Sequence, residues 1–424
     1  MIQSAGKSVY LEKLLPRERQ QGLARAPIAN APNLVGLRDT PTRPVPHDGA
    51  QFVRQRLASV DALRGFSMIG ILGIDGMARA IADMTRGHGS LAGAGAALHW
   101  QFSHPTWEGF TFYDLIFPLF IFVTGVAIVL SLPRMVEEQG MARTQLRVFR
   151  RSLLLYGLGI LFYGGLSNPW PDVRLLGVLQ RIALCYLFAS LLFLHFGRRG
   201  LALTLVALLV GYWALLTFVP VPDVGAPTYA EGMTLANWID RNYLPGRPWY
   251  GEWDPEGLLS TIPAVASCLL GIFAGLLLTD ARLTPQQKST RLLAAGLALL
   301  VAGHLWGLQF PIIKHIWSSS FVLVAGGWSV LLLGLFHEVI DVWKRDRWAT
   351  VLVWIGASPI VLYLAYYMVD FVALARRFVG GDIARLADEH VAPGTADLLA
   401  CSVALAIAIV LAAFLYRRKI FLRV

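Results

Sequence analysis

Residues 112–132 read FYDLIFPLFIFVTGVAIVLSL and carry one charged side chain, Asp114. A helix of about 20 apolar residues crosses the roughly 30 Å of hydrocarbon in a bilayer, so this run predicts a transmembrane helix. Similar apolar runs recur along the chain at 63–83, 152–166, 175–196, 201–219, 262–279, 292–308, 318–339, 349–369 and 397–416. The sequence therefore predicts an all-α, polytopic membrane helix bundle of about ten transmembrane helices.

The composition supports the same fold class. Of the 424 residues, 56% are hydrophobic and only 15% are charged, and the mean hydropathy is +0.56. Soluble domains average about 25% charged residues, so a soluble globular, disordered or coiled-coil protein is excluded. The three cysteines lie inside apolar runs, which argues against a disulfide framework or a cysteine zinc site. We predict no metal.

The basic residues give the predicted orientation. The net charge is +10, and Arg and Lys concentrate in alternate connections, at 133–151, 197–200, 280–291 and 340–348. Cytoplasmic loops carry such an excess, so we expect both termini to be cytoplasmic and no nucleic-acid partner. We predict a flexible cytoplasmic tail at 1–55 and a transmembrane domain at 56–424. The strong preference for Arg over Lys is typical of GC-rich bacteria, so we expect a bacterial inner membrane protein.

Polar residues accumulate on the opposite, periplasmic side, in the connections 84–111, 220–261, 309–317 and 370–396. Rings stack on the C–H faces of sugars, while carboxylates bind hydroxyl and ammonium groups. We therefore predict a periplasmic binding site for an amino-sugar or glycan acceptor, formed by Trp107, Asp254, Glu256 and Trp317. For each tryptophan, the alternative is membership of the aromatic belt at the membrane interface.

A histidine and a carboxylate flank the entry to the 112–132 helix. His104 lies at its predicted outer mouth, and Asp114 lies at its apolar beginning, where an ionisable group is costly and therefore a functional candidate. A carboxylate that orients an imidazole produces a general base or an acyl acceptor. We predict catalytic roles for both residues. The alternative is that His104 serves only as a hydrogen-bond partner.

Other charged residues fall at membrane depth. Asp75 lies deep in the first predicted helix and needs a partner, either His104 or a cationic acceptor, so we add it to the catalytic candidates. A buried arginine requires an anion, such as a carboxylate or a ligand phosphate. Arg181 with Gln180, and Arg151, are therefore candidate phosphate-binding residues. For Arg151 the alternative is a topology signal, and for Arg64 it is a snorkelling anchor.

Several motif-based functions lack support. The chain contains no P-loop, no dinucleotide-binding glycine motif in a strand-helix setting, no HExxH and no GxSxG. ATP-driven pumping, zinc proteolysis and α/β-hydrolase chemistry are thus disfavoured.

Five stretches together resemble the transmembrane acyltransferases of heparan-α-glucosaminide N-acetyltransferase type, and the similarity runs through residues 56–424. They are Arg56-x-x-Ser-Val-Asp61-x-x-Arg64-Gly, His104-x-x-Trp107-x-Gly-x-x-x-x-Asp114-Leu-x-Phe-Pro118-x-Phe, Gly177-Val-Leu-Gln180-Arg181, Asp254-Pro-Glu256-Gly-x-Leu and Lys314-x-x-Trp317-Ser.

The resemblance implies that cytoplasmic acetyl-CoA, as co-substrate, delivers its acetyl group through the bundle to an external acceptor. It places the family's essential histidine at His104. For this reaction we predict that Arg64, Arg151, Arg181, Gln180 and Lys314 hold the donor. The chain departs from the family pattern at Asp75, where the family has asparagine, and at Ser358, where it has the asparagine of Gly-x-Asn. An ionised carboxylate at 75 cannot donate to an oxyanion as an amide can.

Two functions remain open at this point. The first is a transmembrane acyltransferase of this type, with His104 as general base or acyl acceptor. The second is a secondary transporter for a sugar or amino sugar that uses Asp75, Asp114 and Arg181 for ion coupling, although no internal repeat typical of such transporters is evident. The lipid bilayer and the acceptor are the predicted partners. The natural acceptor, the acyl chain length and the choice between monomer and homo-oligomer stay open.

Overall fold

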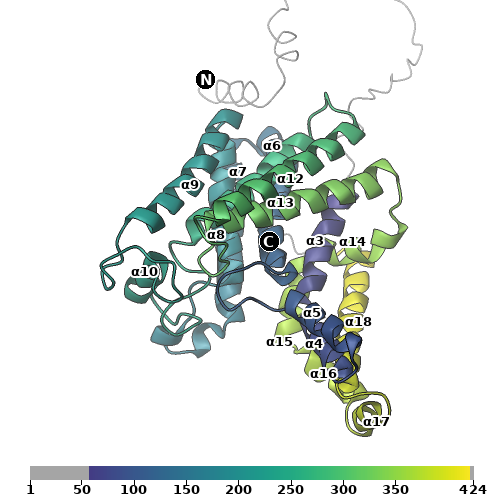
Figure 1. Cartoon of the computed structure of the whole chain (residues 1–424). Helices are drawn as coiled ribbons and strands as arrows, with labels where there is room; N and C mark the ends of the chain where they lie inside the picture. Colours follow the sequence, from purple (N-terminus) through teal and green to yellow (C-terminus); the bar gives the residue numbers. More distant parts are fainter. Residues whose placement is uncertain (1–56, 421–424) are drawn as a thin grey trace, which may run out of the picture. The chain divides into compact units, whose positions relative to one another are not determined.

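The computed structural model describes residues 57–420, and the predicted tail at 1–55 lies outside them. Within this range the chain forms α-helices with short 3-10 and π segments, and no β-strand. The helices are α3 (Ala58–Ile71), α4 (Ile74–Thr85), α5 (Ser90–Gln101), α6 (Phe112–Gln139), α7 (Met141–Phe162), α8 (Val178–His195), α9 (Arg198–Phe218), α10 (Leu235–Tyr243), α11 (Thr261–Leu278), α12 (Pro285–Gly307), α13 (Ser319–Phe336), α14 (Thr350–Ala357), α15 (Pro359–Met368), α16 (Phe371–Val379), α17 (Asp382–His390) and α18 (Thr395–Arg417) (Figure 1).

The all-α polytopic membrane bundle is confirmed. Seven helices in the described range are long and apolar enough to cross a bilayer, or up to nine if two bent helix pairs each form one span. The predicted span at 152–166 falls in the second half of α7, and it is not among the nine. The first half of α7 carries Arg143, Arg147, Arg150 and Arg151, which lowers the hydropathy of the helix as a whole. The side on which each terminus lies remains a prediction.

Three helices form the centre of the bundle. Most residues of α6, α11 and α13 are buried, whereas α9, α12 and α18 expose most of their apolar side chains, as expected for faces that meet lipid. The helices α6 and α11 cross closely at Gly125 and Gly271, where a Cβ atom would collide with the backbone of the opposite helix. Small residues at such crossings allow the close backbone approach that stabilises helix pairs in membranes.

Two of the predicted spans are broken. The first bends by 51° between α3 and α4, and the second bends by 72° between α14 and α15. Gly73 at the first break has φ +93, which suits a residue without a side chain, and Pro359 follows Ser358 at the second. The break corrects the predicted place of Asp75: it lies in the first turn of α4, not deep inside a continuous helix.

The two broken spans contact each other. The Tyr367 hydroxyl of α15 donates to the Ile71 carbonyl oxygen at 3.0 Å, which satisfies a backbone group that the break leaves without a helical partner. The helices α3 and α14 also approach closely at Gly65 and Gly356.

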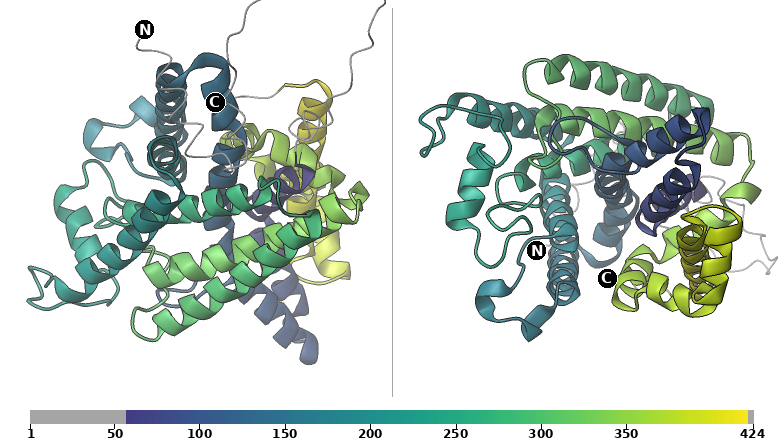
Figure 2. Two further views of the ribbon diagram at one scale, coloured as in Figure 1. Left: turned by 90° about the horizontal axis from the view of Figure 1, so that it is seen from above. Right: turned by 60° about the horizontal axis from the view of Figure 1, so that its bottom comes forward.

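One end of the helical unit is formed by chain segments far apart in sequence. The helices α4 and α5 lie there beside α16, α17 and the beginning of α18, as the views of Figure 2 show. The break between α3 and α4 therefore lies between the central helices and this end.

Candidate functional site

The loop that carries His104 is fixed onto the beginning of α6. The Thr111 hydroxyl donates to the Ser103 carbonyl oxygen at 2.8 Å, and the Thr111 backbone N–H donates to Asp114 Oδ2 at 3.1 Å. The pairing of Thr111 with Asp114 forms a capping box, in which a residue of the first turn closes the beginning of its own helix. Asp114 is fully buried, and its second oxygen, Oδ1, faces the His104 loop.

A second loop, which connects α12 to α13, reaches the same place. A short antiparallel bridge joins Glu108 to Ile313, and the Gly109 N–H donates to the Ile312 carbonyl oxygen at 2.9 Å. A tight turn follows, in which Trp317 has φ +53, a conformation that is rare for a bulky residue and marks backbone strain. This turn positions Lys314 beside His104.

His104, Asp114 and Lys314 form a compact charged cluster. The His104 Nδ1 atom lies 2.7 Å from Asp114 Oδ1. The Lys314 Nζ atom lies 3.0 Å from both His104 ring nitrogens and 3.3 Å from Asp114 Oδ1. Because Asp114 accepts hydrogen bonds, we assign the proton of the neutral imidazole to Nδ1, which leaves the Nε2 lone pair to accept from Lys314.

The environment keeps the imidazole available as a base. Burial lowers the pKa of His104 below its ordinary value, the Asp114 hydrogen bond opposes this, and the Lys314 charge lowers the pKa further. Burial also lowers the pKa of Lys314, against the opposing effect of Asp114 and Glu256. The His104 side chain is still 41% exposed. A neutral imidazole that a reactant can reach suits general base or nucleophilic catalysis near neutral pH.

A second charged cluster centres on Arg174. Its guanidinium forms a bidentate pair with Asp254 at 2.8 and 3.0 Å and contacts Glu256 Oε2 at 2.8 Å. The rings of Tyr163 and Trp249 lie 4.3 and 4.6 Å from its central carbon. Arg174 is absent from the predicted site residues. The available signal was a basic residue in a predicted periplasmic connection, against the positive-inside trend.

These contacts occupy the two carboxylates that the sequence assigns to the acceptor. Asp254 also accepts from the backbone N–H groups of Trp249 and Glu256, at 2.9 and 3.0 Å, and it is 1% exposed. Burial, with the neighbouring Asp254 charge, raises the pKa of Glu256. Burial also raises the pKa of the adjacent Asp240 to about 7. The cluster therefore holds together the chain segments that carry Arg174, Asp254 and Glu256. Of its carboxylates, Glu256 acts electrostatically on Lys314.

Arg181 is wholly buried without a carboxylate partner among the described residues. Its Nη2 donates to the Gly257 carbonyl oxygen at 3.3 Å and to the Ser260 hydroxyl, while Nε and Nη1 have no hydrogen bond there. The guanidinium stacks over the Trp317 ring at 4.9 Å. The neighbouring Gln180 is buried too, with its Oε1 unpaired in the described range. A buried cation with free donors is suited to an anionic or carbonyl ligand.

The two predicted sugar-stacking tryptophans are buried in the protein. Trp107 donates its indole N–H to the Tyr229 carbonyl oxygen at 2.7 Å, and Trp317 donates to the Ser267 hydroxyl at 3.1 Å. Trp107 also stacks on His315, with ring centroids 5.6 Å apart and planes within 10°. Burial lowers the pKa of His315 to about 4, and the Lys314 charge adds to this. The rings of Trp107, His315 and Trp317 therefore pack around the turn that positions Lys314 beside His104.

Two predicted donor-binding residues lie apart from the cluster around His104. Arg64 donates to the Gly356 carbonyl oxygen at 3.3 Å and to Asp61 at 3.2 Å, so it joins α3 to α14. Arg151 of α7 lies over the Tyr186 ring at 4.6 Å, and its Nε is buried without a partner among residues 57–420.

Asp75 in the first turn of α4 is linked to His104 by charge. The Asp75 carboxylate acts electrostatically on His104 and Tyr113, and the Tyr113 and His104 rings lie 4.7 Å apart. Asp75 is partly buried and makes no hydrogen bond or ion pair with the described residues. It is therefore available to a ligand.

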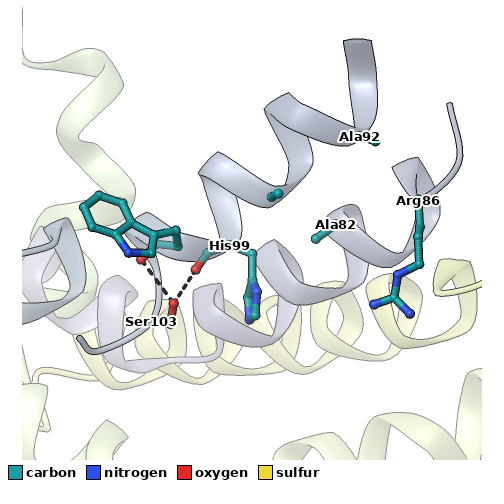
Figure 3. Close-up of a pocket in the computed structure, with 7 residues that line it drawn as sticks. Ala82, Arg86, Ala92, His99 and Ser103 are labelled. Carbon is teal, nitrogen blue, oxygen red and sulfur yellow. Dashed lines mark hydrogen bonds between the residues drawn. The ribbon is translucent and has the colours of Figure 1, made fainter. Parts of the chain in front are cut away.

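A cleft adjoins the His104 loop. Its volume is about 290 Å³, and it opens between α4 and α5, as Figure 3 shows. The lining residues are Ala82, Arg86, Ala92, Ala96, His99, Trp100 and Ser103. The Ser103 hydroxyl lies 2.8 Å from the His99 carbonyl oxygen and ends the cleft one residue before His104.

Comparison with known proteins confirms the resemblance. Residues 56–219 match the family described as a domain of unknown function, DUF5009. The chain is 26% identical to the heparan-α-glucosaminide N-acetyltransferase of Mus musculus over 391 residues, which is 78% of this chain and 57% of the relative. It is 26% identical to the Homo sapiens protein of the same name over 374 residues, with 73% and 52% coverage. The chain spans just over half the length of these relatives.

Proposed function

We propose that the protein is a membrane acyltransferase that moves an acetyl group from cytoplasmic acetyl-CoA to an amine on a periplasmic amino-sugar or glycan acceptor. The observation that carries the proposal is the 2.7 Å contact between His104 and the buried Asp114, with Lys314 at 3.0 Å from the same ring. Acyl transfer can use all three groups: Asp114 orients the ring, the neutral imidazole of His104 accepts a proton, and the Lys314 cation stabilises the oxyanion. The named relatives support the same reaction class.

In the proposed reaction, the acceptor nitrogen attacks the thioester carbonyl carbon and gives a proton to His104 Nε2. The carbon–sulfur bond then breaks, its electron pair stays on sulfur, and the imidazolium returns the proton to the coenzyme A thiolate. Asp114 keeps Nδ1 protonated and stabilises the imidazolium, while remaining ionised itself. A two-step variant, in which His104 Nε2 first accepts the acetyl group, uses the same residues.

Lys314 has a specific part in this scheme. In the present arrangement its ammonium occupies the Nε2 lone pair that a base needs. Proton transfer therefore requires Lys314 to turn away from the ring. The developing oxyanion of the thioester supplies a new acceptor for the Lys314 N–H groups. When Lys314 turns to it, the His104 Nε2 atom is free to act as a base, and the ammonium stabilises the negative charge of the transition state.

The donor needs a polar route through the bundle. The unpaired donors of Arg181 and the unpaired Oε1 of Gln180 offer hydrogen bonds to the amide and carbonyl groups of a pantetheine arm. Arg151, one helix away, is suited to phosphate on the cytoplasmic side. Arg64, which joins α3 to α14, is better placed to hold the broken spans than to hold the donor.

The two broken spans favour a second candidate, a secondary transporter. Discontinuous helices often line the substrate site of such proteins. In that case Asp75 and Asp114 would couple ion movement to sugar movement, and His104 would not react with a thioester.

Purified protein in detergent, mixed with radiolabelled acetyl-CoA and a panel of amino sugars, tests the proposal. We expect label on the sugar with the wild type and a loss of transfer in His104→Ala. Accumulation of sugar inside proteoliposomes without acetyl-CoA, together with no labelled product in detergent, would support the transporter instead.

A further inference from the structure

The helices α8 and α9 leave a groove between them. Only Phe196 and Gly197 connect the end of α8 to the beginning of α9, and consecutive helices with so short a connection usually pack side by side. Here α8 packs mainly against α7 and α11, and α9 packs mainly against α11, which contributes to the lining of the groove. All three lining helices, α8, α9 and α11, are long and apolar enough to cross the bilayer. The groove therefore lies within the membrane-spanning part of the protein.

The wall of the groove is apolar. Its volume is about 630 Å³, within the range of roughly 300 to 1,000 Å³ that is typical of ligand sites. Phe188 of α8, Leu208 of α9 and Val265 of α11 line it, and Phe188 is 47% exposed, so the groove is open to its surroundings. Thr204 also lines it, but its hydroxyl donates to the Gly200 carbonyl oxygen of the same helix at 2.9 Å. The wall thus presents hydrocarbon to an occupant.

Basic groups follow at one end of the groove. His195, the last residue of α8, lines the groove there, and Gln145 of α7 bonds to its ring at 2.8 Å. Arg198 and Arg199 begin α9 a few residues later, and both are exposed. The backbone N–H groups in the first turn of a helix add a partial positive charge to that of the two guanidinium groups. This end of the groove therefore favours an anion.

An anionic phospholipid fits both parts of this arrangement. An acyl chain is apolar and slender enough to lie between two helices, and a phosphate headgroup is the anion that the basic end complements. Basic residues beside grooves between transmembrane helices are typical of sites for anionic lipids. We propose that the groove between α8, α9 and α11 binds an anionic phospholipid, with one acyl chain against its apolar wall and the phosphate at Arg198 and Arg199.

A lipid in this groove contacts the segment that holds Arg181. Leu258 and Thr261, at the beginning of α11, line the groove. The Gly257 carbonyl and the Ser260 hydroxyl, their neighbours in the chain, accept hydrogen bonds from Arg181 Nη2. The bound lipid thus stabilises the segment that keeps the buried arginine in place. This inference goes beyond the proposed function, because lipid binding requires no acyl transfer.

Retention of lipid by the purified protein tests the headgroup contact. The full chain in detergent, freed of lipid, is mixed with equal amounts of phosphatidylglycerol and phosphatidylcholine that carry the same acyl chains, and native mass spectrometry counts the bound lipids. We expect the wild type to retain roughly 10-fold more phosphatidylglycerol, because arginines near a membrane surface attract anionic lipids. Combining Arg198→Gln with Arg199→Gln should remove this preference. Arg291→Gln, which changes an exposed arginine of α12, should retain it.

Filling the groove tests the place of the acyl chain. Thr204→Trp puts a large ring into the groove and should lower retention of phosphatidylglycerol by roughly 10-fold, as expected when a few methylene groups lose their contacts. Leu203→Trp changes the neighbouring residue of α9, which is 72% exposed, and should bind lipid as the wild type does. Ile262→Trp fills the groove from α11 and serves as the second variant if Thr204→Trp does not fold.

Equal retention of the two lipids by the folded wild type, or unchanged retention in the folded variants that fill the groove, would overturn the inference. A lipid-free dimer that Thr204→Trp converts to a monomer would assign the groove to a second copy of the chain instead. The measurements contain neither acyl donor nor acceptor. Absence of acetyl transfer by the wild type would therefore reject the proposed reaction and leave the lipid site intact.

Discussion

The Lys314 ammonium lies 3.0 Å from each ring nitrogen of His104, although 210 residues separate the two in the chain. Both groups titrate, so each affects the protonation of the other. A positive charge at this distance disfavours the imidazolium, and the negative charges of Asp114 and Asp75 favour it. Burial of the ring and the balance of these charges together determine the pH at which His104 becomes a base.

Two substitutions should move the acidic limb of the rate profile in opposite directions. Lys314→Met removes a charge that lowers the pKa of His104, so activity should disappear at a higher pH as the solution is acidified. Asp75→Asn removes a charge that raises this pKa, so the limb should move to lower pH. Profiles of kcat/KM between pH 4.5 and 8 measure both shifts. Shifts in the same direction would remove His104 as the titrating group.

Removing the imidazole should cost far more than removing its orienting carboxylate. We expect His104→Ala to lower kcat by roughly 100- to 10,000-fold, the usual contribution of a general base. Asp114→Asn keeps a hydrogen-bond acceptor but allows the wrong tautomer, so kcat should fall while KM changes little.

Tyr243→Phe on the exposed surface of α10 provides the control for these turnover measurements and should match the wild type. A wild-type kcat in Asp114→Asn would show that the 2.7 Å contact has no part in catalysis.

The local parts of the site were predictable from the sequence, because local rules form them. Thr111 and Asp114 stand at the spacing of a capping box, and His104 precedes them in the same loop. The apolar runs likewise predict the helices, because the bilayer fixes their length. The contact of Lys314 with His104 depends instead on how α13 packs against α6 and on the path of the loop that precedes α13, which a single sequence does not encode in any short pattern.

Contacts between distant parts of the chain also explain why the predicted acceptor-binding residues have other partners in the structure. Trp107, Asp254 and Trp317 were assigned to ligand binding because rings stack on sugars and carboxylates bind hydroxyl and ammonium groups. In the structure each of the three has a hydrogen-bond partner inside the protein. The partners lie 50 to 122 residues away. The break at Gly73 was also not predicted, since one glycine in an apolar run is compatible with a continuous helix.

Arg174 should matter for stability more than for chemistry. Arg174→Met leaves Asp254 and Glu256 buried without their cation, which typically costs about 3 to 5 kcal/mol in the free energy of unfolding. Thermal unfolding in detergent measures the loss. Arg376→Met removes a pair with Asp397 in which both side chains are 62% exposed, and it should cost less than about 1 kcal/mol. Equal unfolding midpoints for the two variants would contradict the structural role of Arg174.

His315 should make the folded state sensitive to acid. Its pKa of about 4 lies below the ordinary value of 6.5, because burial disfavours the charged ring. Above pH 6.5 the ring is neutral whether the protein is folded or unfolded, and its contribution to stability is complete. As the pH falls toward 4, the unfolded chain takes up a proton that the folded chain refuses, and on the order of 3 kcal/mol of stability is lost.

His315→Gln isolates this contribution. The amide can still reach the Tyr250 hydroxyl, which lies 3.3 Å from the imidazole Nε2, but it does not titrate. The unfolding midpoint of this variant should therefore fall less between pH 7 and pH 4 than that of the wild type. His88→Gln changes an exposed histidine and should follow the wild-type curve. Parallel curves for wild type and His315→Gln would place the acid sensitivity in another group.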